Sequence, residues 1–159
     1  EEQHSMNVSE LCKTIGEKLE LPTTEIAQLR SAGFLHDIGK IGISEHILNK
    51  KGEFSKDEKL EFRQHPVIGY RILNLFDNTL NLAEGVYSHH ERWNGTGYPR
   101  ALSGCEIPLM ARIIAIAEAY DKLLNGYHGR AVSHDEALQR LRKEAGIAFD
   151  PKLVEVFAV

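Results

Sequence analysis

The chain has 159 residues, of which 42% are hydrophobic and 26% are charged, with a formal net charge of -4. This length suits one domain over residues 1–159 with a single core, and the composition excludes a disordered chain. The mildly acidic charge disfavours polymeric nucleic acid as a partner. It does not exclude a small nucleotide, because bound divalent ions can supply local positive charge.

Two cysteines and the distribution of apolar residues bear on the compartment. Cys12 and Cys105 have no near neighbour of their kind, which gives little support to a disulfide framework or a thiolate metal site. The sequence has no run of 18 apolar residues and no export signal. We therefore expect a cytoplasmic protein and, since the chain begins at Glu1 without a methionine, a piece of a longer one.

The spacing of apolar residues is helical nearly everywhere, which predicts an all-α domain folded as a single helical bundle. A stripe at i, i+3, i+4 and i+7 runs from Val8 to Leu19 and predicts a first helix that Pro22 ends. A second helix is predicted from about Thr24 to Leu35.

Polar residues with catalytic potential occur at the ends of these predicted helices. We expect the second helix to carry His36 and Asp37 near its end, before Gly39 breaks it. Pro66 is suited to the first turn of a later helix, which places His65 at a junction. We expect this position of His65 to be fixed by the helix and still accessible.

In the second half of the chain, polar candidate residues again occur at the end of a predicted helix. A further helix, running from Leu80 through Tyr87, is predicted to carry His89 and His90, and a long loop rich in glycine and proline comes after it. Long loops are often functional. The longest predicted helix carries Glu118 beside its apolar stripe. Capping signals predict three further helix starts, at Ser55 with Glu58, at Ser133 with Glu136, and at Asp150-Pro151.

Imidazole and carboxylate groups are ligands for divalent Fe, Mn, Zn and Co, so the sequence indicates a metal site without thiolates. Adjacent residues on a helix end project about 100° apart. Asp37 is therefore suited to bridge two ions while His36 binds one of them. Facing helices of a bundle commonly supply the remaining ligands, and the candidates are His65, His89, His90 and Glu118.

Each candidate also has a structural interpretation. A lone histidine on an apolar helix is more often a hydrogen-bonded core residue than a ligand, and we give that interpretation to His46, His128 and His134. The other five candidates need polar partners as well, and one metal centre supplies them more simply than five separate partners would. These candidates are His36, Asp37, His65, His89 and His90. Glu118 remains open between a metal ligand and two structural roles, a solvated carboxylate on the helix face or a partner for Arg112 or Lys122.

Four motifs follow one another along the chain: His36-Asp37-Ile38-Gly39-Lys40, His65-Pro66, His89-His90-Glu91-Arg92 and Gly95-Thr96-Gly97-Tyr98-Pro99. Together they closely resemble the HD-GYP branch of the HD metal-dependent phosphohydrolases, and the resemblance spans essentially the whole chain. It implies a bacterial cyclic di-GMP phosphodiesterase in which water activated by the metal ions attacks the phosphodiester, giving pGpG and, in some members, GMP.

The resemblance also implies a cofactor and partners. It implies two or three divalent metal ions, with iron or manganese favoured, held by His36, Asp37 as the bridge, His65, His89, His90, Glu118 and an early histidine, His4. Such domains are usually C-terminal output domains, so we expect an upstream sensory or receiver domain in the full-length protein. Whether the chain forms a homodimer is open.

For the substrate, the resemblance implies that Lys40 faces a phosphate and contributes to catalysis, and that Tyr98, between Gly97 and Pro99, helps to hold the nucleotide. Lys40 has an alternative interpretation as a solvated cation at a helix end. The loop has one as an ordinary turn. Trp93 either anchors the loop or stacks on a guanine base.

Two departures from the family pattern leave the activity open. Glu118 stands where the family most often has an aspartate, and the segment 125–130, where basic residues grip phosphate in the family, keeps only Arg130 as a firm cation. Three functions follow: a cyclic di-GMP phosphodiesterase, a non-catalytic module that binds a dinucleotide or a protein, and an HD phosphohydrolase acting on another cyclic dinucleotide or nucleotide.

Overall fold

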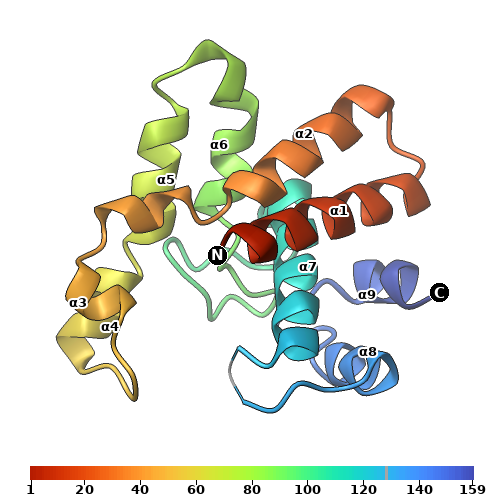
Figure 1. Ribbon diagram of the computed structural model, residues 1–159. Coiled ribbons are helices and arrows are strands. Elements are labelled where there is room, and N and C mark those ends of the chain that lie inside the picture. Colours follow the sequence, from red (N-terminus) through yellow and green to blue (C-terminus); the bar gives the residue numbers. More distant parts are fainter. Residues whose placement is uncertain (128) are drawn as a thin grey trace.

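A computed structural model describes residues 1–127 and 129–159, so His128, to which we gave a structural role, lies outside the described residues. This part of the chain is helical, with two isolated β-bridges and no strand, which confirms the all-α prediction (Figure 1). Among these helices, none combines the length and the apolar character that crossing a bilayer requires. The elements are α1 (Glu2–Lys18), α2 (Thr23–Leu35), η1 (Ile38–Gly42), α3 (Glu45–Leu48), α4 (Lys56–Phe62), α5 (His65–Leu73), η2 (Asp77–Thr79), α6 (Leu80–Tyr87), η3 (Gly104–Glu106), α7 (Leu109–Asn125), α8 (His134–Lys143) and α9 (Pro151–Ala158), with η marking 3₁₀ helices.

Helix α7 runs through the middle of the domain (Figure 1). The antiparallel pair α1 and α2 packs against it on one side, and α6 contacts it together with α2. Helices α8 and α9 cover its C-terminal half, while α5 pairs with α6 and with η1. The short helices α3 and α4 extend away from this body. The bundle thus gathers the ends of α2, α5 and α6 beside the centre of α7.

One core holds the helices together. The predicted stripe of α1 is buried, with Val8, Cys12 and Ile15 fully inaccessible, and it meets Ile113 and Ile116 of α7, which are equally buried. Burying such an aliphatic side chain stabilises the fold by roughly 1.5–3 kcal/mol. The amphipathic patterns therefore predicted both the helices and the faces that pack.

The predicted helix starts are confirmed. Ser55 and Glu58 form a reciprocal capping box at α4, the Ser133 side chain accepts from the backbone of α8, and Asp150 caps α9. These bonds satisfy backbone N–H groups that have no partner inside the helix.

The expectation that Gly39 breaks the second helix is wrong. Helix α2 already ends at Leu35, and Gly39 lies inside η1. A Cβ atom at Gly39 would lie 1.7 Å from the carbonyl oxygen of His65. Glycine is thus required because η1 packs directly against the backbone at the start of α5.

Candidate metal centre and substrate cavity

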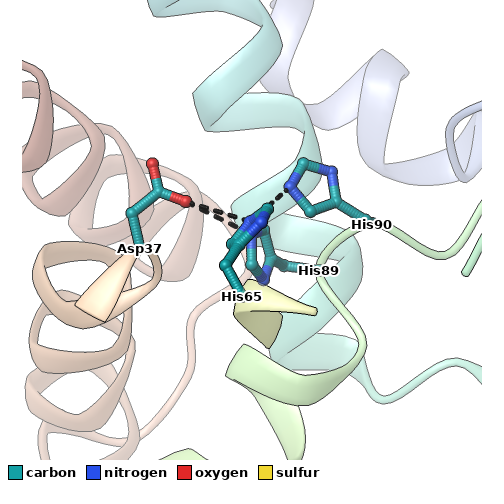
Figure 2. Close-up of side chains that lie close together, drawn as sticks. All are labelled: Asp37, His65, His89 and His90. Carbon is teal, nitrogen blue, oxygen red and sulfur yellow. Dashed lines mark hydrogen bonds and ion pairs between the residues drawn. The ribbon is translucent and has the colours of Figure 1, made fainter. Parts of the chain in front are cut away.

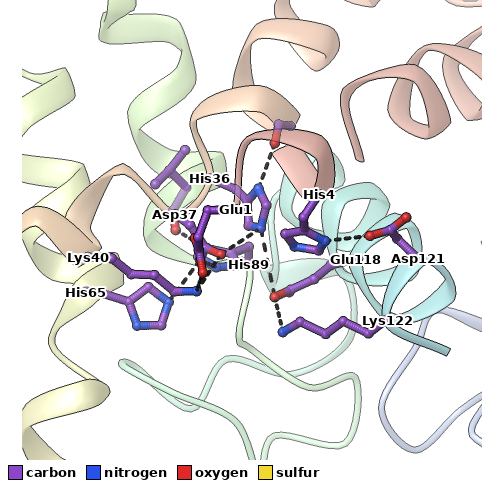
Figure 3. A network of polar contacts seen from close by, with 12 residues as sticks. Glu1, His4, His36, Asp37, Lys40, His65, His89, Glu118, Asp121 and Lys122 are labelled. Carbon is purple, nitrogen blue, oxygen red and sulfur yellow. Dashed lines mark hydrogen bonds and ion pairs between the residues drawn. The ribbon is translucent and has the colours of Figure 1, made fainter. Parts of the chain in front are cut away.

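Seven polar side chains from five helices and the segments that follow them meet beside the middle of α7 (Figures 2 and 3). They come from the first turn of α1, the end of α2, the start of α5, the segment after α6 and the middle of α7. The seven residues are His4, His36, Asp37, His65, His89, His90 and Glu118. The structure therefore brings together every residue that the sequence analysis gave as a metal ligand.

Three of the imidazole rings are oriented in the same way. Each places its Nδ1 atom against a backbone carbonyl three residues earlier in the chain. The bonds join His36 to Gly33 at 2.6 Å, His65 to Phe62 at 2.7 Å and His89 to Val86 at 2.6 Å. A carbonyl oxygen only accepts, so Nδ1 donates, and the neutral ring has its lone pair on Nε2. All three Nε2 atoms point into the cluster.

Asp37 lies at the centre of these rings. Its Oδ1 atom is 3.4 Å from Nε2 of His65 and 3.7 Å from Nε2 of His89, and its Oδ2 atom is 3.2 Å from Nε2 of His36. Burial raises the pKa of Asp37, but the adjacent His36, with the contacts from His65 and His89, holds it well below the ordinary value. Lys40 lies 3.0 Å from Oδ2. Asp37 is thus a buried carboxylate with each oxygen facing different rings.

The donor set fits divalent metal ions. Within the described residues, five buried side-chain atoms have no hydrogen-bond partner: Nε2 of His4, His36 and His89, and both carboxylate oxygens of Asp37. Leaving a polar atom buried and unpaired costs about 1–3 kcal/mol, so such a concentration indicates a missing partner. The ligand atoms form two groups that share Asp37, namely Asp37, His65, His89 and His90, and His4, His36, Asp37 and Glu118. Nitrogen and carboxylate oxygen suit iron, manganese, zinc or cobalt.

Burial and neighbouring charges together determine whether the histidine rings of the cluster are protonated. Burial lowers the pKa of His90 well below its ordinary value, and the neighbouring His89 lowers it further, so the ring is neutral. Burial also lowers the pKa of His36, but the Asp37 carboxylate outweighs this effect and raises it to about 8. Near neutral pH, His90 is therefore neutral whereas His36 holds a proton.

Glu118 is buried, with 5% of its surface exposed, so its interpretation as a solvated helix-face carboxylate is wrong. Its Oε1 atom lies 2.5 Å from the ammonium group of Lys122 and 3.9 Å from Nε2 of His36. Arg112, the other expected partner, pairs with Asp150 instead. Glu118 thus faces the metal cluster on one side and a cation on the other.

A cavity of about 760 Å³ opens next to the cluster. His89, His90 and Glu118 line it, so the cluster forms part of its wall. This volume falls within the range of ordinary small-molecule sites. Six cations also line the cavity: Arg63, Arg92, Lys122, Arg130, Arg140 and Lys143. The carboxylates of Glu91, Glu118 and Glu144 also line it, so the cations outnumber the acids among the described lining residues, which favours an anionic ligand despite the net negative charge of the chain.

The predicted substrate residues separate into two groups. Gly97, Tyr98 and Arg130 line the cavity, although Arg130 is largely exposed and contacts Glu136. Three others are not among the described residues that line it, namely Lys40, Trp93 and Pro99. The aromatic ring of Tyr98 stacks on that of His90, at 4.9 Å between centroids and 15° between planes.

The remaining substrate candidates have other positions. Lys40 is mostly buried and contacts Asp37 and Glu1, which does not agree with a solvated helix-end cation. Trp93 lines a small separate hollow and bonds through its backbone to Ala148, a position that favours its role as a loop anchor. The peptide bond before Pro99 is cis.

The backbone of the Gly-Tyr-Pro loop is held by close contacts with the segment that precedes it. A Cβ atom at Gly97 would lie 2.4 Å from the backbone nitrogen of Arg92, so the loop folds back tightly on the segment that carries His90. The buried carboxylate of Glu91 accepts from the backbone N–H groups of Arg100 and Leu102. Sequence analysis missed this role of Glu91. The signal that could have suggested it is the position of this charged residue directly after two candidate ligands, His89 and His90.

The histidines with structural interpretations lie outside the cluster. His46 is exposed and contacts Glu58, and Nδ1 of His134 lies 2.5 Å from the hydroxyl oxygen of Tyr120. Both residues are exposed, so the prediction of hydrogen-bonded core residues is wrong for them, although each ring has a polar contact.

The fold and the site define the class of this chain. Residues 1–153 match the HD domain, so the chain belongs to the HD-domain family. It is 35% identical over 158 residues to a cyclic di-GMP phosphodiesterase of Thermotoga maritima, covering 98% of this chain and 43% of that protein. It is 37% identical over 151 residues to the cyclic di-GMP phosphodiesterase response regulator RpfG of Xanthomonas campestris pv. campestris, covering 93% and 40%.

A solved structure, that of a cyclic GMP-AMP specific phosphodiesterase of Vibrio cholerae, matches with a TM-score of 0.77 and 28% identity, covering 97% of this chain and 42% of that one. These relatives confirm the resemblance to HD-GYP phosphodiesterases. The chain spans less than half the length of the curated relatives described here.

Proposed function

We propose that this domain holds two divalent metal ions and hydrolyses a phosphodiester bond of a cyclic dinucleotide, with cyclic di-GMP as the leading substrate. The observation that carries the proposal is a group of five buried ligand atoms that have no hydrogen-bond partner among the described residues, although Oδ2 of Asp37 forms an ion pair with Lys40, and this group lies beside a cavity lined by cations. The names of the relatives from Thermotoga maritima and Xanthomonas campestris support the choice of substrate. Imidazoles and carboxylates suit several divalent metals, and among these we favour iron and manganese because the resemblance to the HD-GYP family implies them.

The proposed ligand sets follow the two groups of side chains that share Asp37. One set is Asp37, His65, His89 and His90, and the other is His4, His36, Asp37 and Glu118. When bound in such a site, divalent ions make water nucleophilic near neutral pH and offset the charge of a phosphate group. Asp37 directs one oxygen toward each set, which supports its role as the bridging carboxylate.

Other side chains of the domain would position the substrate. Lys40 holds its ammonium group 3.0 Å from Asp37, where it can donate to a phosphate oxygen adjoining the centre. Tyr98 forms the cavity wall next to His90 and offers its edge to a nucleotide. The cations of the cavity would offset the second phosphate of a cyclic dinucleotide, which compensates for the weak basic character of segment 125–130.

A second substrate, cyclic GMP-AMP, is favoured by the match with the Vibrio cholerae structure, which is named for that specificity. A site made of metal ligands and cations recognises phosphate and does not by itself select bases. The response-regulator relative supports a further proposal, that an upstream receiver or sensory domain controls this domain.

The test is anaerobic purification, metal analysis, and incubation with cyclic di-GMP, 3′3′-cyclic GMP-AMP and cyclic di-AMP, followed by separation of the products. We expect about two metal ions per chain and release of pGpG, with GMP if a second cut occurs. Asp37→Asn is the matched control, because it keeps the size of the side chain but removes its charge, and it should lose both metal and hydrolysis. A metal-loaded protein that binds the dinucleotide without cleaving it would instead support the non-catalytic signalling module.

A further inference from the structure

His4 is oriented differently from the three rings that donate to a backbone carbonyl. Its Nδ1 atom lies 2.6 Å from the Oδ2 atom of Asp121 on α7, and both side chains are buried, with 5% and 3% of their surfaces exposed (Figure 3). The Nε2 atom of His4 is buried and has no hydrogen-bond partner among the described residues. A carboxylate therefore holds the far side of this ring.

The other oxygen of Asp121 is also occupied. Its Oδ1 atom accepts from the side-chain amides of Asn7, at 2.8 Å, and Asn125, at 2.9 Å. The orientations of both amides are fixed by further bonds. The Oδ1 atom of Asn7 accepts from Gln3, and the amide nitrogen of Asn125 also donates to the backbone carbonyl of Asp121. Two donors thus face Oδ1 and leave Oδ2 for His4.

We infer that Asp121, held by Asn7 and Asn125, is a positioning residue that fixes the tautomer of His4. A carboxylate only accepts, so Nδ1 of His4 must donate, and the neutral ring then carries its lone pair on Nε2. That lone pair belongs to the ligand group of His4, His36, Asp37 and Glu118. The inference rests on the proposed metal site, although the tautomer itself is a property of the metal-free protein.

The network explains why an amide cannot replace this carboxylate. In Asp121→Asn, the side-chain oxygen would face the two donors, Asn7 and Asn125, because the opposite orientation would place N–H groups against N–H groups. The new NH₂ group would then face Nδ1 of His4, which would have to accept. The ring proton would move to Nε2, and the atom directed toward the metal would no longer be a ligand.

The first test is direct. Nitrogen-15 labelled, metal-free protein is examined by long-range ¹H–¹⁵N NMR at about pH 8.5, well above the ordinary histidine pKa of about 6.5. The signals of His4 are assigned by their absence in His4→Ala. We expect the Nδ1–H tautomer in the wild type and the Nε2–H tautomer in Asp121→Asn. An Nε2–H tautomer in the wild type, or an unchanged tautomer in the variant, would overturn the inference.

The second test is a double-mutant cycle on metal affinity, measured by competition with a chelator. Asp121→Asn should weaken binding about 10- to 100-fold, the usual effect of losing a partner of a metal ligand. In the His4→Ala background the same substitution should have no further effect, because Asp121 acts through His4. An additional loss there would overturn the inference. A wild-type protein that binds no metal but shows the expected tautomer would instead count against the proposed function alone.

Discussion

The Nε2 atoms of His65 and His90 lie 3.1 Å apart. His65 donates its Nδ1 proton to the carbonyl of Phe62, so the neutral ring accepts at Nε2, and the proton between the two rings belongs to His90. A metal ion that binds Nε2 of both rings therefore requires His90 to carry its proton on Nδ1 instead. The stacking of Tyr98 on His90 places the Gly-Tyr-Pro loop against the ring that has to change its tautomer.

Tyr98→Ala should therefore impair both the substrate and the metal. Loss of the stacked ring removes an aromatic contact of roughly 0.5–1.5 kcal/mol and frees His90 to turn. We expect KM to rise about tenfold, with partial loss of metal. Tyr98→Phe keeps the ring and should retain near-wild-type metal content. Steady-state kinetics and metal analysis check this, and an equal defect in both variants would assign the effect to the hydroxyl group.

Glu118→Asp tests the longer carboxylate at the position where the family has aspartate. Shortening the side chain by about 1.5 Å withdraws the carboxylate from His36, to which Glu118 now extends within 3.9 Å. We expect metal affinity to fall at least about tenfold, as measured by chelator competition. Lys122→Met is the control, because it removes the cation and leaves the Glu118 carboxylate in place. Tighter binding by Glu118→Asp would show that the native residue is a compromise.

Gly39→Ala should destabilise the domain strongly. The added methyl group would meet the carbonyl oxygen of His65 at 1.7 Å, and relief requires η1 and α5 to separate. Overpacking typically costs about 1–3 kcal/mol, and we expect a cost at or above the upper end because the obstacle is backbone. Gly16→Ala is the control, because its Cβ meets only side-chain atoms of Leu29 and Ile26, at 3.0 and 3.1 Å. Urea unfolding curves of the two variants give the comparison.

The metal-free protein should lose stability as the pH rises from about 6.5 to 8. Its folded state raises the pKa of His36 from 6.5 to about 8, so folding favours the protonated ring. The stabilisation is complete below pH 6.5 and disappears as the pH passes about 8, a loss on the order of 2 kcal/mol. The pKa values of His89 and His90 are lowered, so these rings stay neutral across this window. Unfolding free energies measured in EDTA test this, and the slope should vanish in His36→Ala.

Much of the fold was predictable because helices such as α1 are amphipathic and helices such as α4 are capped by side chains close by in the sequence. The spacing from Val8 to Leu19 and the capping box at Ser55 depend on neighbours within a few residues, and the structure confirms both. The role of Gly39 was not predictable, because the atom that excludes a side chain there belongs to His65, 26 positions away in the sequence. Such a contact appears only when two segments are brought together.

The site was predictable to a similar extent. The ligand candidates could be chosen by residue type, whereas the residues that orient them could not. Asp121 was missed because an acidic residue four positions after Ala117 resembles a solvated side chain, although that spacing places it on the buried face of α7. Pairing it with His4, 117 positions away, required the fold.

The carbonyl bonds of His36, His65 and His89 have a consequence for how the centre assembles. The hydrogen bond that orients each ring joins two residues within a stretch of four, so the ring takes its orientation once that single turn of the chain has formed. When the segments pack together, the Nε2 atoms of these three rings are already oriented and only have to be brought to one place. Grafts of these tetrapeptides onto other helix ends should carry their ring directions with them.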